Sequence, residues 1–233
     1  MVVHLIRSEE YSAENFWQVV DLLKKFPGPL QFRTREQPIS VDENEIQIEK
    51  FEKKKFEEQK DPPMVFSLIG KSSFAAAPEE IEWMSWNSIF SICKKYRTKH
   101  DVGDDEFVVL LTELSNQYNW FSAANPNGSR DLFVHTKFWD YFTGSDQRYP
   151  VAYLTSTGIL KKLLFQDYSD LQKHWHEEPQ GCMLDFCRQK KEISFKMRTG
   201  DVCPDCLQLI QERNLNHDVV AQIFEVMEGI RAQ

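Results

Sequence analysis

Residues 106–113 read EFVVLLTE, a continuous apolar run between the polar stretches GDD and SNQ. An apolar run of this length, rich in β-branched side chains, is typical of a strand that is buried on both faces. We therefore expect these residues at the centre of a sheet, with helices packed against it.

The N-terminal region predicts further parts of the same layer. VVHLI at residues 2–6 favours a strand, the apolar spacing over 12–25 favours a helix with Ser12 as its N-cap, and LQFRTRE at 30–36 favours a second strand. The sequence FPGPL at 26–30 ends the helix, because proline cannot continue it. This β-α-β order predicts an α/β (or α+β) fold with a mixed sheet and packed helices.

Later segments extend this pattern. A helix is expected at 86–96, a strand at DLFVHT (131–136), and a largely apolar helix at 150–165 that should cross the core. The C-terminal stretch 215–233 predicts an amphipathic helix, with its apolar face formed by Val219, Ile223, Val226, Met227 and Ile230.

The composition limits the class of protein. The chain has 233 residues, 28 Lys and Arg against 36 Asp and Glu, and a net charge of −8. Such an acidic balance argues against DNA or an anionic membrane as a partner, because phosphate affinity comes from clustered cations. No apolar run reaches the roughly 18 residues of a transmembrane helix, and no signal peptide is recognisable. We expect a single cytoplasmic domain over residues 1–233.

Residues 42–63, DENEIQIEKFEKKKFEEQKDPP, are charged throughout. They predict either a solvated surface element, such as a helix with Glu and Lys at i,i+4, or an excursion from the domain that binds a partner. We expect this segment to be the most protease-sensitive interior stretch of the chain. The apolar MVFSLIG that follows at 64–70 predicts a third strand.

Four of the five cysteines lie close together near the C-terminus, with the spacing C-x4-C-x15-C-x2-C. The CPDC turn presents two sulfurs to one point, and thiolates suit structural Zn²⁺ in a closed tetrahedral site. Two disulfides fit less well, since no export signal is recognisable. A redox CxxC would sit between a strand and a helix of a βαβ unit, whereas this pair is matched by a second one. The sequence predicts a zinc subsite within 174–210, with structural Zn²⁺ held by Cys182, Cys187, Cys203 and Cys206.

Two further features concern the same region and the remaining cysteine. His174 or His176, in KHWHEEP, is an alternative ligand that could replace one thiolate. Cys93 stands alone in an apolar helical stretch and is expected to be a small buried hydrophobe.

Motifs for familiar chemistries are missing from the sequence. It contains no GxxxxGK[ST], GxGxxG, GxSxG or HExxH motif, so catalysis is not the leading expectation. The weak candidates for a catalytic role are polar side chains at strand ends or within the cysteine segment: His135, Asp131, Glu113 and Asp185.

The stretch 106–206 resembles the catalytic half of archaemetzincins, a zinc metallopeptidase family of the metzincin clan. The order of elements is similar, Cys182-Met183 matches the family's Cys-Met pair, and Cys203 with Cys206 matches its closing CxxC. The resemblance implies a metzincin-like scaffold with a four-cysteine structural zinc site.

The chain departs from that family at the catalytic motif, HExxHxxGxxHC. Tyr153, Leu154 and Thr157 stand where the first His, the Glu and the second His would be. Glu177 occupies the place of the family's first zinc cysteine, so Cys187 would have to supply the fourth thiolate. The resemblance therefore implies a scaffold that has lost its catalytic metal and kept its structural one.

Three functions remain open on this basis. The leading one is a non-catalytic, metzincin-like zinc-binding protein that acts as an interaction or accessory module, with a protein as its partner. The second is an enzyme, a hydrolase, that uses a cleft along the 150–165 helix. The third is a zinc-dependent nucleic-acid-binding protein, which would use the basic segment CRQKKEISFKMR between the cysteine pairs; its weakness is the acidic net charge.

Overall fold

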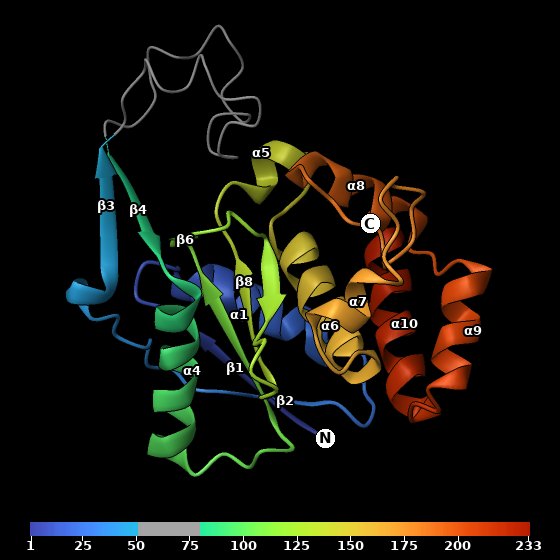
Figure 1. The fold of residues 1–233 in the computed structure, drawn as a ribbon, viewed down its shortest axis with the longest axis horizontal. Helices are drawn as coiled ribbons and strands as arrows, with labels where there is room; N and C mark the ends of the chain where they lie inside the picture. The colour runs from blue at the N-terminus through green and yellow to red at the C-terminus, as the bar shows by residue number, and fades with distance from the viewer. Residues whose placement is uncertain (51–79) are drawn as a thin grey trace, which may run out of the picture.

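A computed structural model describes residues 1–50 and 80–233 of the chain (Figure 1). Its main sheet has five strands in the order β2-β1-β5-β8-β7. The strands are β1 (Val2–Arg7), β2 (Gln31–Thr34), β5 (Phe107–Thr112), β7 (Ser122–Ala124) and β8 (Asp131–His135). All are parallel to their neighbours except β7, which pairs antiparallel with β8. The predicted mixed sheet and α/β class are confirmed.

Strand β5 occupies the centre of this sheet, as its apolar run predicted, and all six of its residues are buried. Helices cover both of its faces. On one face, Ile89, Cys93 and Tyr96 of α4 (Trp86–His100) pack in a cluster with Val108 and Leu110 of the strand. Cys93 is fully buried, as expected. Helix α4 continues four residues beyond its predicted end and stops at Asp101, which adopts the left-handed conformation.

The opposite face is covered by α1 (Ala13–Lys24) and α6 (Arg148–Leu164), and α10 (His217–Arg231) packs against α6. The Ser12 side chain accepts a hydrogen bond from the backbone N–H of Asn15, which confirms the predicted N-cap of α1. Helix α6 packs against both α1 and α10 and against β7 and β8. It crosses the core as predicted, so its side chains face the sheet, the neighbouring helices or the groove described below.

A second, smaller sheet has the order β3-β4-β6. A 3-10 turn at Glu43–Glu45 leads into β3 (Ile46–Lys50), which pairs antiparallel with β4 (Glu80–Met84), and β4 pairs parallel with β6 (Ser115–Asn116). The first part of the charged segment 42–63 is therefore a turn and a strand rather than a helix. Residues 51–63, and the strand expected at 64–70, lie outside the described residues.

The C-terminal part of the chain adds four shorter helices: α5 (Trp139–Thr143), α7 (Tyr168–Gln172), α8 (Lys190–Thr199) and α9 (Pro204–Glu212). The irregular segment 173–189 joins α7 to α8 and lies beside α6. Within residues 1–50 and 80–233, none of the helices has the length and apolar character needed to cross a membrane.

Candidate metal centre and the groove beside it

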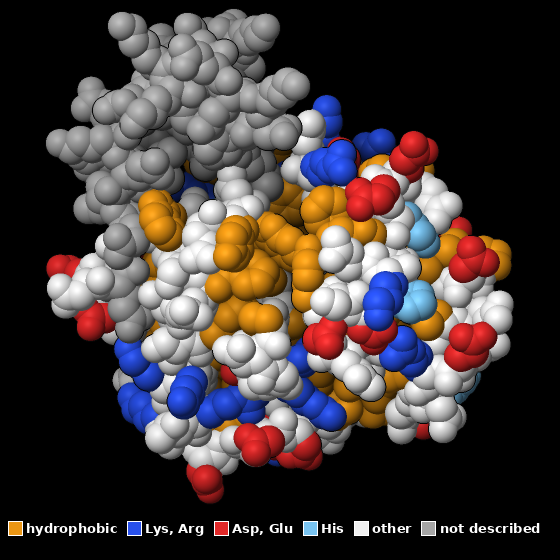
Figure 2. Space-filling view, in the orientation of Figure 1, with side chains coloured by type: hydrophobic (Ala, Val, Ile, Leu, Met, Phe, Trp, Pro, Cys, Tyr) orange, Lys and Arg blue, Asp and Glu red, His pale blue; other side chains and the backbone are white. Residues whose placement is uncertain are grey.

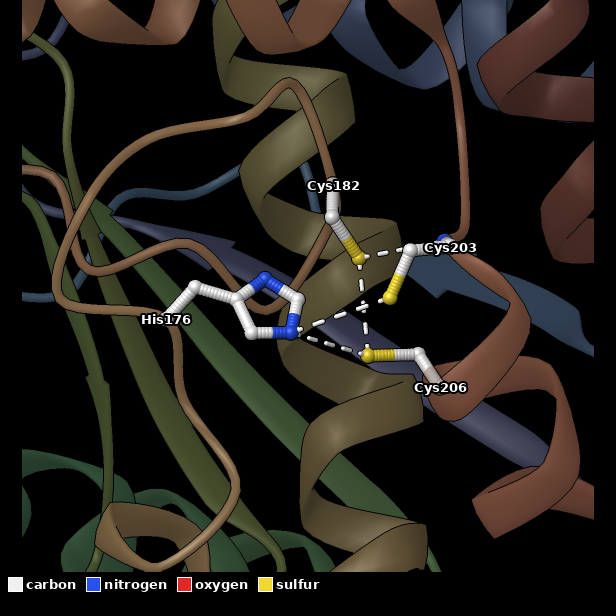
Figure 3. Close-up of side chains that lie close together, drawn as sticks. All are labelled: His176, Cys182, Cys203 and Cys206. Carbon is white, nitrogen blue, oxygen red and sulfur yellow. Dashed lines mark hydrogen bonds between the residues drawn. The ribbon is translucent and has the colours of Figure 1, made fainter.

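Four side chains converge on one point (Figure 3). His176 and Cys182 come from the loop before α8, and Cys203 and Cys206 from the start of α9. Their four potential ligand atoms all lie within 4.8 Å of one another. The Sγ atoms of Cys182 and Cys206 are 3.5 Å apart, and Nε2 of His176 lies 3.5 Å from Sγ of Cys206 and 3.7 Å from Sγ of Cys203. Ligands about 2.0–2.3 Å from a tetrahedral Zn²⁺ are separated by about 3.5–3.8 Å, so the group suits zinc.

Local backbone structure brings these ligands together. Cys203 is the N-cap residue of α9 and Pro204 its first helical residue, so Cys206 lies in the first turn and both sulfurs point the same way. Cys182 reaches them through an isolated bridge with Asp201, in which the N–H of Met183 donates to the Asp201 carbonyl. The x15 gap between the cysteine pairs is thereby closed by backbone pairing around α8.

A second isolated β-bridge, between the backbones of His176 and Asp185, positions His176. Oδ1 of Asp185 lies 2.9 Å from Nδ1 of His176, and its Oδ2 accepts hydrogen bonds from the N–H groups of Gln180 and Gly181. A proton on Nδ1 that is donated to this carboxylate leaves the Nε2 lone pair free for a metal. Carboxylates hold metal-binding histidines in this way. Asp185, a predicted candidate residue, therefore orients a ligand.

Hydrogen bonds among the cysteines stabilise a thiolate, which is the form that binds a metal cation. The Sγ atoms of Cys182 and Cys206 share one hydrogen bond, and the backbone N–H of Cys203 donates to Sγ of Cys182. These hydrogen bonds lower the pKa of Cys182 to about 5, and the same thiol–thiolate contact raises the pKa of Cys206. A thiolate is thus present at neutral pH, and a metal cation would replace the shared proton.

Cys187 does not belong to this group, which corrects the predicted four-cysteine set to three cysteines and one histidine. The bridge between His176 and Asp185 places the imidazole, and not the next cysteine along the chain, against the other sulfurs. Cys187 lies two residues beyond that bridge and lines the adjacent groove, where burial raises the pKa of its thiol. His174, the other histidine considered, stacks on Phe165 with ring centroids 5.7 Å apart.

A groove of about 860 Å³ lies beside the metal centre. The floor is formed by α6, one wall by β7 and the loop after it, and the other wall by residues 165–175 and 184–189. Figure 2 shows hydrophobic side chains gathered in the middle of this face of the molecule. Its aromatic lining is formed by Trp86, Tyr118, Trp120, Phe121, Phe165, Tyr168, Trp175 and Phe186.

Strand β7 is the edge of the five-stranded sheet, and its free side contributes to the groove. The N–H of Asn125 donates to Asp131 and the N–H of His135 donates to Phe121. Because hydrogen-bonded and non-bonded pairs alternate in an antiparallel ladder, the N–H and C=O groups of Ser122 and Ala124 point away from β8. Among the described residues, no other strand pairs with this edge.

Four cationic and two acidic side chains line the groove. They are Lys161, Lys162, Arg188 and Lys196, against Asp167 and Asp185. Nζ of Lys196 is buried and donates to the carbonyls of Met183 and Asp185. Lys161 makes no hydrogen bond or ion pair within the described residues. Burial, together with the like charge of Lys196, lowers the pKa of Lys161 to about 7.

The remaining predicted candidates lie elsewhere. Nδ1 of His135 contacts Nζ of Lys190 and its Nε2 contacts the Glu113 carbonyl, while burial and the Lys190 charge lower the pKa of His135 well below its usual range. Burial raises the pKa of Glu113. Asp131 begins β8, at the opposite end of the strand from His135, and is held by Arg97 and Ser129. The structure therefore does not bring His135, Asp131 and Asp185 into one site.

The positions that correspond to the metallopeptidase motif hold side chains other than its histidines and glutamate. Tyr153 and Thr157 are each 1% exposed in the core, and Leu154 lines the groove. The group around His176 is the one cluster of three or more metal-ligating side chains found in the described part of the chain. Sequence reasoning missed Lys161 and Lys196 as groove residues; the Lys161-Lys162 pair within an otherwise apolar helix was the available signal.

No protein-family model and no curated protein matches this sequence. Solved structures with a similar arrangement include an archaemetzincin from Methanopyrus kandleri, with a TM-score of 0.48 and 10% identity over 92% of this chain and 95% of that one. Another is an archaemetzincin from Archaeoglobus fulgidus complexed with malonate (TM-score 0.47, 9% identity, 90% and 100% coverage). A third is a zinc-dependent peptidase from Methanocorpusculum labreanum (0.43, 12%, 89% and 99%). At this level of identity they are likenesses of fold alone.

Proposed function

We propose that this chain is a zinc-stabilised, non-catalytic binding module whose groove takes an extended segment of a partner protein. The observation that carries the proposal is the outer edge of β7, which pairs with no other strand in the described part of the chain and faces a groove with aromatic walls. An extended peptide can add to such an edge as a further strand. Main-chain hydrogen bonds then supply affinity, and side-chain pockets supply specificity.

The donor set of the metal centre supports a structural rather than a catalytic role. Four protein ligands complete a tetrahedron and leave no position for water or substrate, whereas a catalytic zinc keeps one position open. On the groove floor, α6 presents Leu154, Gly158 and Lys161, and none of these is the imidazole or carboxylate that metal-dependent hydrolysis requires.

The metal centre and the groove share one segment of chain. His176 and Cys182 lie in the loop that also provides Asp185, Phe186 and Cys187 to the groove wall. Zinc at this centre would supply a crosslink between that loop and the start of α9, with His176, Cys182, Cys203 and Cys206 as its ligands. We infer that the metal keeps the wall in place, so that the groove is preformed for its partner.

The basic segment 187–198 gives little support to the nucleic-acid alternative. Two of its lysines, Lys190 and Lys196, are each only 2% exposed. Nζ of Lys190 contacts His135 and lies 4.3 Å from the centre of the Trp139 ring. These charges face the protein interior, whereas phosphate contacts require cations on the surface.

A binding experiment with a substituted edge strand tests the proposal. The probes are acetylated and amidated pentapeptides of alternating valine and threonine, followed by fluorescence anisotropy with zinc-loaded protein. Ala124→Pro should weaken binding about tenfold, since one backbone hydrogen bond contributes roughly 0.5–1.5 kcal/mol and the proline ring also obstructs the edge. It should leave the ladder to β8 intact, because the N–H of Ala124 points away from β8.

Ala124→Ser is the matched control, because it keeps the backbone N–H and should bind like the original protein. Equal peptide binding by both variants would overturn the edge-strand proposal. Mass spectrometry of the same mixtures tests the hydrolase alternative: stoichiometric recovery of intact peptide supports a binding module, while zinc-dependent cleavage would replace it with an enzyme.

A further inference from the structure

We propose that the groove floor holds a carboxylate-binding site centred on Lys161, which receives a carboxylate of the bound polypeptide segment. That the carboxylate belongs to a polypeptide rests on the proposed function. The site itself rests on the geometry around Lys161. It predicts that the partner segment is acidic where it crosses α6.

Lys161, which is half-buried, differs from the buried lysines Lys190 and Lys196, because no acceptor for it lies within the described residues. Lys196 donates to two backbone carbonyls of the 183–185 turn, and Lys190 contacts His135 and the Lys137 carbonyl. Both therefore hold neighbouring segments in place. Lys161 lines the groove without a hydrogen bond or ion pair within the described residues. Its ammonium group has three donors to offer a ligand.

The acidic residues of the groove do not neutralise this cation by direct contact. Oδ1 of Asp167 accepts from the N–H of Asp170 at the start of α7. The Asp185 carboxylate is hydrogen-bonded to His176 and to two backbone N–H groups. Nζ of Lys162, the neighbouring cation on the floor, contacts one acceptor among the described residues, the Asn125 carbonyl at 3.5 Å. The groove thus has an excess of positive charge in a chain whose net charge is −8.

An unpaired cation in an apolar groove is costly, and a carboxylate offsets that cost. Burial and the charge of Lys196 disfavour the protonated form of Lys161, while Cys187, Cys182 and Asp185 favour it only in part. A ligand carboxylate beside Nζ would restore the charged form and add a charge-assisted hydrogen bond. Peptide binding should therefore take up a proton near pH 7 and strengthen as the pH falls toward 6.

The position of the site suits a peptide that lies along β7. Lys161 belongs to the same face of α6 as Leu154 and Gly158, and all three line the groove together with Ser122 and Ala124 of the edge strand. Alternate side chains of an added strand would point toward this floor, because side chains in a strand alternate between its two faces. One acidic residue at such a position would reach the Lys161 ammonium group.

Two peptides that differ in one group test the inference. The first is acetylated and amidated Val-Thr-Glu-Thr-Val, and the second has glutamine in place of the glutamate. We expect the glutamate peptide to bind at least tenfold more tightly at pH 6.5, which corresponds to about 1.4 kcal/mol. Lys161→Met should abolish this preference, Lys161→Arg should retain it, and Lys24→Met, an exposed lysine on α1, should leave it unchanged. A third peptide, with a free C-terminal carboxylate and no acidic side chain, shows whether the chain terminus is the source instead.

A small carboxylate separates failure of this inference from failure of the proposed function. Glutarate alone, titrated into labelled protein, should shift the amide NMR signals of residues 158–162, and Lys161→Met should remove that shift. If glutarate binds and no peptide does, the carboxylate site stands and the peptide-binding function is rejected. If both peptides bind equally and glutarate causes no shift at 158–162, the site at Lys161 is rejected while the groove function stands.

Discussion

Oδ1 of Asp185 lies 2.9 Å from Nδ1 of His176, and this contact joins the metal centre to the wall of the groove. The carboxylate is buried and also accepts hydrogen bonds from the backbone of Gln180 and Gly181. One side chain therefore sets the orientation of a metal ligand and the path of the loop that carries it.

Substitution of this carboxylate should weaken metal binding without removing a ligand. Asp185→Asn should lower zinc affinity about 10–100-fold, the range typical of changes to residues that orient a ligating histidine. One zinc per chain should still be present at saturation. Competition with a chromophoric chelator measures the affinity, and Glu178→Gln, an exposed neighbour, is the control. Equal affinities for Asp185→Asn and the original protein would contradict the role given to Asp185.

The three-cysteine, one-histidine assignment predicts that substitutions of different cysteines change the zinc content differently. Cys206→Ser and His176→Ala should each reduce zinc content below one per chain after dialysis, because each removes one of four ligands. Cys187→Ser and Cys93→Ser should keep one zinc per chain. Elemental analysis by mass spectrometry measures the content. Loss of zinc in Cys187→Ser with retention in His176→Ala would restore the four-cysteine set.

Removal of the metal should loosen the chain locally. Chelation of zinc should raise hydrogen exchange first in residues 174–189 and at the start of α9, since the ligands connect these segments. Strand β5 should stay protected, because its burial between α4 and the helices on the opposite face does not involve the metal. Exchange followed by mass spectrometry measures both regions. A uniform increase across the whole chain would show instead that the metal supports the entire fold.

The unpartnered lysine in the groove should make stability depend on pH. The pKa of Lys161 is lowered to about 7, against about 10.4 in an unfolded chain. Between these values the unfolded state holds a proton that the native state has released, so the free energy of unfolding rises with pH. This contribution is at most about 1.4 kcal/mol per pH unit.

Lys161→Met lacks that titration and should be more stable than the original protein at pH 7. The difference should shrink steadily as the pH rises toward 10. Urea unfolding at several pH values measures it, and the exposed Lys24→Met should show no such trend. A difference between Lys161→Met and the original protein that does not change with pH would mean that Lys161 is not desolvated in the native state.

Much of the fold could be predicted from local patterns. The run at 106–113 is apolar on both faces, and only a strand between two helical layers buries both. The helix near 150–165 was likewise recognisable, because apolar residues cover most of its surface. The pairing of residues 46–50 with 80–84 was not predicted, because the contact is distant in sequence and the charged composition favoured a solvated helix or an excursion from the domain.

The metal centre likewise has ligands that the sequence predicted and one that depended on the fold. The cysteines at 182, 203 and 206 were predictable, since thiolates at such spacing suit a structural zinc ion. The fourth ligand depended on the backbone bridge that sets His176 beside Asp185 and carries Cys187 past the centre. Which of two nearby ligand types completes a tetrahedron depends on backbone pairing, and the spacing of residues does not contain that information.

The sequence by itself determined the central strand, the helices that bury it and the presence of a thiolate-rich zinc site, because burial and metal affinity follow from residue type and local period. The tertiary structure alone decided that, within residues 1–50 and 80–233, no strand pairs with the outer edge of β7 and no acceptor binds Lys161 in the groove beside it. Both are relationships between segments far apart in the chain. An unpaired hydrogen-bonding group or charge is defined by what packs around it, and only the folded arrangement specifies those neighbours.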